Sequence, residues 1–274
     1  MDDRERITSR DNRRLVALRK VRDGKERSLI FIEGVRLCVE ALRSGIEGDE
    51  CYVSDSFDAW DRFPNIRERS VGVAAKLFPS VSDTDNSQGI ILTAKRPAYD
   101  LHDIKERMDR AGSIPITIFL SEVNNPANLG AVLRSAEAAG AAGIITSPAS
   151  ADPYSPKALR ASMGSAFRLP VVENIDLQQA LSWAAELQLA TIAIDVNGRA
   201  SYTDLNWTEP ALVVFGSEAH GLRPGQLDQV AQKVVIPMDG KVESLNLAVS
   251  AAVILFEARR KKLEASGSRW HLKE

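Results

Sequence analysis

The chain has few of the residues that mark secreted or metal-binding proteins. Its 274 residues include only two cysteines, Cys38 and Cys51, and three histidines, and none of them has the spacing of a metal site. The opening MDDRERITSR has no apolar core, and no apolar run approaches the roughly 20 residues that span a bilayer. We therefore expect a cytoplasmic protein with no disulfide framework, no bound metal, no secretory signal and no membrane segment.

Several common catalytic motifs are also missing. No G-x-G-x-x-G follows a predicted strand, which argues against a nicotinamide or flavin cofactor on a Rossmann fingerprint. The phosphate-binding G-x-x-x-x-G-K-[ST] is absent, which argues against NTP hydrolysis. The chain has no G-x-S-x-G either, so Ser244 does not lie in a nucleophile elbow.

Charge is unevenly distributed along the chain. The formal net charge of -2 argues weakly against a nucleic-acid partner, but residues 4–27 hold ten Lys or Arg against four Asp or Glu, a local net charge of +6. Such a segment is an electrostatic footprint for phosphates. The alternative is a solvated amphipathic helix, with Leu15, Leu18 and Val21 on its apolar side. The cations expected to contact RNA are Arg10, Arg13, Arg14, Arg19, Lys20, Arg22, Lys25 and Arg27.

The first part of the chain reads as a small α/β domain over residues 1–96. A proline-bounded linker, 97–114, follows it and includes a helical patch at 103–110. Helices are predicted at 1–27, 34–45 and 74–79, and strands at 28–33, 50–53, 71–73 and 89–95.

The second domain is predicted to span residues 115–274. Strands are predicted at 115–123, 143–146, 169–172, 191–196, 211–216 and 233–238, and helices at 128–140, 155–164, 177–189, 226–230 and 245–263. Alternation of apolar strands with helices predicts a parallel sheet with helices on both faces.

Three polar loops follow strands of this second domain, where α/β enzymes bind ligands. Residues 124–130 lead to Arg134, and we place Asn128 at a helix N-cap. An asparagine and an Arg fork can hold a sugar and a phosphate. The alternatives are a capping role alone for Asn128 and a surface ion pair for Arg134.

The other two loops are 213–222 and 236–250. In the first, Gly216 permits close approach of a ligand, and Glu218 supplies a carboxylate. His220 has no partner at a recognisable spacing, which is typical of a turn or surface residue. In the second, Ser244 and Asn246 lie where a long helix begins; the alternative to ligand binding is that Ser244 only caps that helix.

Together the three loops resemble the motifs of the SpoU/TrmH family of RNA ribose 2′-O-methyltransferases, in the SPOUT superfamily. The matching positions are Asn125, Pro126, Asn128, Gly130 and Arg134; then Gly216, Glu218 and Gly221; then Ile236, Pro237, Met238, Ser244, Leu245 and Asn246. The segment 160–172 also resembles this family. Residues 31–36 (FIEGVR), which include Arg36, are similar to a substrate-binding domain with a ribosomal-protein fold that binds RNA.

The resemblance implies a C-terminal deep trefoil knot, a homodimer and S-adenosylmethionine (SAM) as cofactor. It places SAM on Phe215, Gly216, Ser217, Ile236, Met238, Ser244, Leu245 and Asn246. The implied reaction is methylation of a ribose 2′-hydroxyl in RNA, with 23S ribosomal RNA favoured by the N-terminal domain. The alternatives are a tRNA ribose methyltransferase and a non-catalytic RNA-binding protein with a vestigial methyltransferase domain.

The resemblance also implies roles for five side chains. It gives Arg134 the activating role, but guanidinium groups hold their protons too tightly to be good bases, so we prefer a clamp for ribose or phosphate. Asn128 and Ser244 would orient the ribose, and Asn246 would brace the SAM loop. Glu218 would fix the loop geometry by pairing with Arg134 or Asn128. Whether Arg134 serves its own or the partner subunit stays open.

Overall fold

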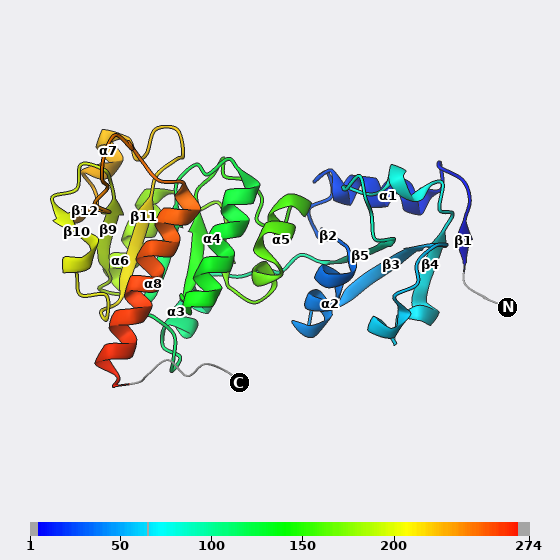
Figure 1. Cartoon of the computed structure of the whole chain (residues 1–274), viewed down its shortest axis with the longest axis horizontal. Helices are drawn as coiled ribbons and strands as arrows, with labels where there is room; N and C mark the ends of the chain where they lie inside the picture. The colour runs from blue at the N-terminus through cyan, green and yellow to red at the C-terminus, as the bar shows by residue number, and fades with distance from the viewer. Residues whose placement is uncertain (1–4, 65, 268–274) are drawn as a thin grey trace. The chain divides into compact units, whose positions relative to one another are not determined.

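The structure is a computed structural model that describes residues 5–64 and 66–267. The chain divides into two compact units, each with its own sheet (Figure 1). The units are Met1–Pro97 with Pro153–Phe167, and Ala98–Asp152 with Arg168–Glu274. The first unit is therefore discontinuous in sequence.

The first unit contains a mixed sheet in the order β1-β4-β3-β5-β2. β1, β4 and β3 run parallel, whereas β5 is antiparallel to both β3 and β2. The strands are β1 (Arg6–Ile7), β2 (Leu29–Glu33), β3 (Gly48–Ser54), β4 (Ser70–Val73) and β5 (Ile90–Lys95). The helices are α1 (Arg13–Arg22), α2 (Val35–Arg43) and α5 (Pro156–Ser162).

Helix α1 is shorter than the helix predicted over residues 1–27. Asn12 caps it, because its side chain accepts a hydrogen bond from the Arg14 backbone N–H at 2.9 Å, and β1 lies before that cap. The chain leaves the helix before Gly24, which has a φ of +69°. The amphipathic pattern is confirmed by the buried residues Leu15, Leu18 and Val21.

Two other predictions need correction. The helix expected at 74–79 is only a 3-10 turn, η3 (Phe78–Ser80), because Pro79 cannot donate the hydrogen bond that would continue an α-helix. The expected linker contains α3 (Leu101–Met108), capped by Asp100, and its Ile104 and Met108 are buried in the core of the second unit.

The second unit contains a seven-stranded sheet in the order β10-β12-β9-β11-β6-β7-β8. Every pairing between these strands is parallel, which confirms the predicted sheet. The strands are β6 (Ile116–Leu120), β7 (Gly143–Thr146), β8 (Val171–Val172), β9 (Ala190–Ile194), β10 (Ala200–Ser201), β11 (Ala211–Phe215) and β12 (Gln232–Val235). β10 is a strand that the sequence pattern did not indicate.

Helices flank this sheet. α3 and α6 share one buried cluster with side chains of β6, β9 and β11, whereas α4 and α8 lie side by side (Figure 1). Their bounds are α4 (Pro126–Ala139), α6 (Leu177–Glu186), α7 (Pro224–Leu227) and α8 (Leu247–Ala265). β12 ends before Pro237, which the predicted strand included, since a proline has no N–H for the ladder. The polar loops thus leave the carboxyl ends of β6, β11 and β12; β6 and β11 are neighbours, and β9 lies between β11 and β12.

Candidate functional site

Three polar loops are joined by hydrogen bonds at the carboxyl edge of the second sheet. Nδ2 of Asn128 donates to Oε1 of Glu218 at 2.8 Å, and Oδ1 of Asn128 accepts from Nδ2 of Asn246 at 3.1 Å. The three side chains follow β6, β11 and β12 respectively, and β6 pairs with β11. Of the two partners expected for Glu218, the structure therefore selects Asn128. We call this set the amide chain.

The helix cap in the first loop is Asn125 and not Asn128. The Asn125 side chain accepts from the Ala127 N–H at 3.0 Å, and Pro126 occupies the first helical position, where its missing N–H costs nothing. Asn128 then lies in the first turn of α4 with its amide available. The prediction of Asn128 as a cap was wrong by three residues, and the correction makes the amide chain possible.

The cap of α8 is Asn246 and not Ser244. Oδ1 of Asn246 accepts from the backbone N–H of Ala248 at 2.9 Å and of Val249 at 3.4 Å. Asn246 thus uses its oxygen on its own helix and its nitrogen on Asn128. Ser244 is exposed and forms no hydrogen bond with the described residues, so the reading of Ser244 as a cap was wrong.

Arg134 stands apart from the amide chain. It is exposed in the third turn of α4, and it has no ion pair or hydrogen bond among residues 5–64 and 66–267. Six residues separate it from Asn128, which is about 9 Å along a helix. Within the part of the chain that the structure describes, the surface ion pair considered for Arg134 is therefore not formed, and its guanidinium is available to a ligand.

The loop after β11 closes on itself. Ser217 and Gly221 exchange backbone hydrogen bonds of 3.1 and 2.9 Å. A Cβ at Gly216 would lie 2.0 Å from the carbonyl carbon of Gly221, so glycine is required there by the loop itself. Packing within the loop accounts for this glycine, and its contact with a ligand stays a prediction. The exposed His220 donates its backbone N–H to Ser217 Oγ at 3.3 Å, as a turn residue does.

Sequence reasoning missed an ion pair that ties this loop to β6. Arg223 Nη2 lies 2.7 Å from Oε1 of Glu122. Glu122 has a φ of +52°, which is uncommon for a residue other than glycine, and its backbone N–H donates to Ser147 Oγ at 2.7 Å. A single sequence gives no sign that a glutamate will adopt the left-handed backbone conformation.

Residues 236–246 form an irregular segment suited to an apolar ligand with hydrogen-bond acceptors. Val242 is 57% exposed and Leu245 is 36% exposed, whereas Ile236 and Met238 are half-buried. Within the described chain, the backbone N–H groups of residues 243–245 donate no hydrogen bond. Strand β11 ends at the buried Phe215, and Gly216 and Ser217 follow it. These features fit an adenosine-like group held by backbone.

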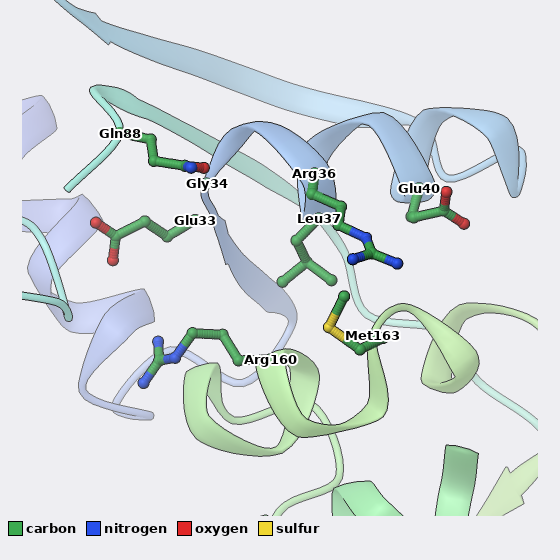
Figure 2. A pocket seen from close by; sticks show the side chains of 8 residues that line it. All are labelled: Glu33, Gly34, Arg36, Leu37, Glu40, Gln88, Arg160 and Met163. Atoms are coloured by element: carbon green, nitrogen blue, oxygen red, sulfur yellow. The ribbon is translucent and has the colours of Figure 1, made fainter. Parts of the chain in front are cut away.

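The first unit has a pocket of about 210 Å³ between α2 and α5 (Figure 2). Leu37 and Met163 supply apolar surface, and the guanidinium of Arg36 extends from α2 above Met163. The other lining residues are Glu33, Gly34, Glu40, Gln88 and Arg160. No sequence signal indicated this pocket, because α5 lies about 120 residues after α2 in the chain.

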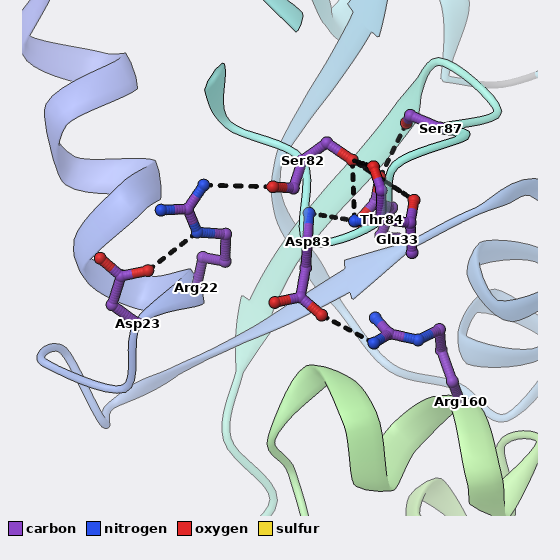
Figure 3. A network of polar contacts seen from close by, with 8 residues as sticks. All are labelled: Arg22, Asp23, Glu33, Ser82, Asp83, Thr84, Ser87 and Arg160. Atoms are coloured by element: carbon purple, nitrogen blue, oxygen red, sulfur yellow. Dashed lines mark hydrogen bonds and ion pairs between the residues drawn. The ribbon is translucent and has the colours of Figure 1, made fainter. Parts of the chain in front are cut away.

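A buried glutamate organises one wall of that pocket (Figure 3). The Glu33 carboxylate, only 5% exposed, accepts hydrogen bonds from Ser82 Oγ, from Ser87 Oγ at 2.7 Å and from Thr84 Oγ1 at 3.1 Å. It also accepts from the Asp83 backbone N–H at 2.8 Å. Four donors on one carboxylate fix the loop 82–88.

Replacing Glu33 with glutamine should destabilise the first unit. The amide would point its NH₂ group at donors that now bond to a carboxylate, which leaves buried polar groups unsatisfied at a cost of about 2–3 kcal/mol. Urea unfolding followed by circular dichroism measures this loss. A Gln88→Glu variant, altered on the exposed side of the same loop, is the control, and an equal loss in both would argue against the network.

The structure divides the predicted RNA-contacting cations into two groups. Arg14 pairs with Glu5 and with Glu50 at 3.1 Å, and Arg19 donates to the Arg10 carbonyl at 3.0 Å. Arg22 donates to the carbonyl of Ser80 at 3.1 Å and to that of Ser82, also at 3.1 Å; Figure 3 shows the second of these bonds. These three hold the fold together. The exposed cations are Arg10, Arg13, Lys20, Lys25, Arg27 and Arg36.

Burial and a hydrogen bond to Glu50 raise the pKa of Tyr52, so the phenol stays protonated. The Glu50 carboxylate accepts from this phenol and also pairs with Arg14, which joins α1 to β3.

Among residues 5–64 and 66–267, no three His, Cys, Asp or Glu side chains gather as metal ligands would. In the same residues, no helix has the length and apolarity to cross a membrane.

Comparison with protein families gives two matches. Residues 115–256 match the SpoU rRNA methylase family, and residues 12–92 match the MRM3-like substrate-binding domain. The first match contains all three loops of the amide chain and the second contains α1 and α2.

Individual relatives agree with these matches. A 23S rRNA (uridine(2479)-2′-O)-methyltransferase of Streptomyces viridochromogenes is 31% identical over 204 residues, which cover 72% of this chain and 69% of that protein. A 23S rRNA (guanosine(2553)-2′-O)-methyltransferase of Bacillus subtilis is 27% identical over 264 residues, covering 93% and 99%. The crystal structure of the SpoU methyltransferase AviRb from Streptomyces viridochromogenes with its cofactor AdoMet superposes with a TM-score of 0.81 at 25% identity, covering 94% of this chain and 100% of that one.

Proposed function

This chain belongs to the SpoU rRNA methylase family, and on that premise we propose that it transfers the methyl group of SAM to a ribose 2′-hydroxyl of ribosomal RNA. The amide chain carries this proposal, because Asn128, Glu218 and Asn246 follow three different strands and meet at one sheet edge. The two named 23S rRNA relatives act on a uridine and a guanosine, so their names assign no nucleotide to this enzyme.

The cofactor would be held by the irregular segment 236–246 and the end of β11. Bound there, SAM supplies a methyl group made electrophilic by its sulfonium. Unpaired backbone N–H groups at residues 243–245 suit its adenine and carboxylate acceptors, and the exposed Leu245 suits its apolar ring faces. Asn246 braces this segment, since its side chain joins α8 to Asn128.

The protein's part in the reaction is positioning and charge stabilisation. Asn128 and Ser244 would orient the ribose, and Glu218 would hold the loop after β11 against α4. Arg134, which is exposed and unpaired among the described residues, would clamp the ribose or its phosphate through its fork. Its positive charge would stabilise the developing alkoxide, and the proton would leave to substrate phosphate or water.

The direct test is transfer of tritiated methyl from SAM to RNA transcribed without modification. We expect incorporation into 23S rRNA and none into tRNA. Some relatives are named only as tRNA/rRNA methyltransferases, so the two RNAs belong in the same experiment. Label in tRNA alone would reverse the substrate assignment, and SAM binding without label in either RNA would favour a vestigial enzyme.

The first unit would bind the RNA. Its match to a substrate-binding domain and its exposed cations support this role. We also propose that its fold is similar to that of a ribosomal protein that binds RNA. We assign RNA binding to the first unit, Met1–Pro97 with Pro153–Phe167, and catalysis to the second, Ala98–Asp152 with Arg168–Glu274. Because the proposed substrate is ribosomal RNA, we propose that the enzyme acts in the cytoplasm.

Replacing Arg13 and Lys20 with alanine should weaken RNA binding. Both are exposed and lie seven residues apart on one face of α1, so each would contact a phosphate. We expect the slope of log K for RNA binding against the logarithm of the salt concentration to become shallower by about 1 to 2. The affinity for SAM should not change. Filter binding at several salt concentrations measures this slope. An unchanged slope would remove α1 from the RNA contact.

We propose that the C-terminal segment forms a deep trefoil knot. β12 pairs with β9, yet α8 packs against α4, which follows β6. The segment 236–246 therefore has to cross the carboxyl ends of β9 and β11, where the loop 213–222 also lies. Mechanical stretching from both termini would leave a knotted chain shorter than an unknotted one of the same length.

We propose further that the enzyme is a homodimer that uses the outer face of α8. Phe256 is 41% exposed and Val249 is 49% exposed, and their seven-residue spacing places them on one side of the helix. Such apolar surface is typical of an interface.

Replacing Phe256 with glutamate should therefore produce monomers. A charge at the core of an apolar interface costs several kcal/mol because it is desolvated without a partner. Light scattering after size exclusion gives the mass, and Phe256→Leu, which stays apolar, should remain dimeric. A dimeric glutamate variant would place the interface elsewhere.

A further inference from the structure

The pocket between α2 and α5 offers donors without partners above an apolar floor (Figure 2). Arg36 is exposed and has no hydrogen bond or ion pair within the described part of the chain. Arg160 uses Nη2 on Asp83 at 2.7 Å, and its Nη1 is buried with no hydrogen-bond partner in residues 5–64 and 66–267. A ligand there would have to supply acceptors and an apolar face.

The walls of the pocket are fixed in advance. The loop 82–88, held by the Glu33 carboxylate, presents Asp83 to Arg160 (Figure 3). The same loop presents Gln88, whose Oε1 accepts from the Val35 backbone N–H at 2.7 Å. That bond leaves the Gln88 amide nitrogen as another donor at the rim.

The floor includes a residue in an unfavourable backbone conformation. Met163 ends α5 with a φ of +52°, in the left-handed region that favours glycine. Its thioether points toward Leu37 and lies beneath the Arg36 side chain (Figure 2). A polarizable sulfur is a good neighbour for an aromatic ring, and a guanidinium stacks on one.

We propose that this pocket receives a single unpaired base of the RNA substrate, turned out of its stack between Arg36 and the floor formed by Leu37 and Met163. At about 210 Å³ it lies below the roughly 300–1,000 Å³ of pockets for drug-sized ligands, which suits one base. Sequence-selective proteins read RNA mainly through unstacked bases of loops and bulges. This inference rests on the proposed function and gives the first unit a means of choosing its RNA beyond phosphate attraction.

Two variants test the pocket without disturbing the fold. Met163→Gly removes the floor at a position whose φ favours glycine, and Arg36→Ala removes an exposed side chain that the fold does not use. We expect each to weaken binding of an unmodified 23S rRNA fragment about tenfold, the usual effect of losing one stacked base. Arg69→Ala, an exposed arginine of the same unit outside the pocket lining, is the control and should bind as wild type.

The salt dependence separates a base from a phosphate. Met163→Gly removes no charge, so its binding should fall by the same factor at every salt concentration. RNA affinities within twofold of wild type for both variants, with unchanged melting temperatures, would overturn the proposal. So would equal losses in Arg69→Ala.

Crosslinking identifies the occupant. RNA containing 4-thiouridine or 6-thioguanosine should crosslink to the peptides that carry Leu37 or Met163, and excess unlabelled RNA should compete. The four nucleoside monophosphates serve as the second probe: tight binding of one of them that RNA does not displace would assign the pocket to a free nucleotide and overturn the proposal.

Methyl transfer by the wild-type enzyme at saturating RNA is measured separately. If it occurs while the pocket variants bind RNA normally, only the pocket assignment fails. If no RNA is methylated but the variants still lose RNA affinity, the proposed function fails and the pocket assignment stands.

Discussion

Replacing Arg134 with lysine should lower the rate of methyl transfer by about 10² to 10³-fold, the usual effect of losing a donor that stabilises transition-state charge. Lysine keeps the positive charge but has no planar fork, so it cannot hold two oxygens in one geometry. Arg134 has no partner in the described residues, so the change breaks no structural contact. The measurement is kcat at saturating RNA and SAM.

The control is Arg110→Lys, an exposed arginine after α3 that precedes β6 and so lies outside the loops of the site. We expect the Arg110→Lys variant to have the same kcat as the wild-type enzyme. Near-normal turnover of the Arg134 variant would rule out a bidentate role and leave only a requirement for charge.

The second large effect is expected from Asn128→Asp. It removes the donor to Glu218 and puts two carboxylates 2.8 Å apart where a hydrogen bond was. Loss of a hydrogen bond costs about 1 kcal/mol, and like charges at this range add about 1 to 4 kcal/mol depending on solvent screening. We expect kcat/KM to fall about 100-fold, against about tenfold for Asn128→Ala, which adds no charge.

A double variant separates positioning from chemistry. With Asn128→Asp and Glu218→Gln together, the glutamine amide can donate to the new carboxylate, and that carboxylate still accepts from Asn246. If Glu218 only positions its loop, activity should recover by at least tenfold. Asn124→Asp, an exposed change in the same loop, should have little effect. Failure of the double variant to recover would mean that the Glu218 carboxylate itself contacts substrate.

Periodicity and strand composition predict six of the seven strands of the second sheet because these six contain short apolar runs, whereas the two residues of β10 form none. Helix boundaries were less accurate. The sequence offers two candidate caps for each helix, Asn125 and Asn128 for α4 and Ser244 and Asn246 for α8. Only the backbone path decides that Asn125 and Asn246 are the caps. The three amide-chain residues could be nominated one by one, but their contacts depend on strand order.

Other features lie beyond sequence reasoning for identifiable reasons. The local charge of the N-terminal segment suggested eight cations for RNA, yet Arg14, Arg19 and Arg22 find partners through tertiary contacts. The pocket needs α2 and α5, which are remote in sequence. The Glu122–Arg223 pair depends on the left-handed backbone conformation of Glu122, which the residue type does not predict.

The central claim is that the methyl group goes to a ribose oxygen of ribosomal RNA. Labelled 23S rRNA from the reaction, hydrolysed in alkali, tests it directly, because a 2′-O-methyl group blocks attack of that oxygen on its own phosphodiester. We predict that the label is recovered in one alkali-resistant dinucleotide, and that the Arg134→Lys variant produces little of it. Recovery of the label in mononucleotides would place the methyl on a base and contradict the account.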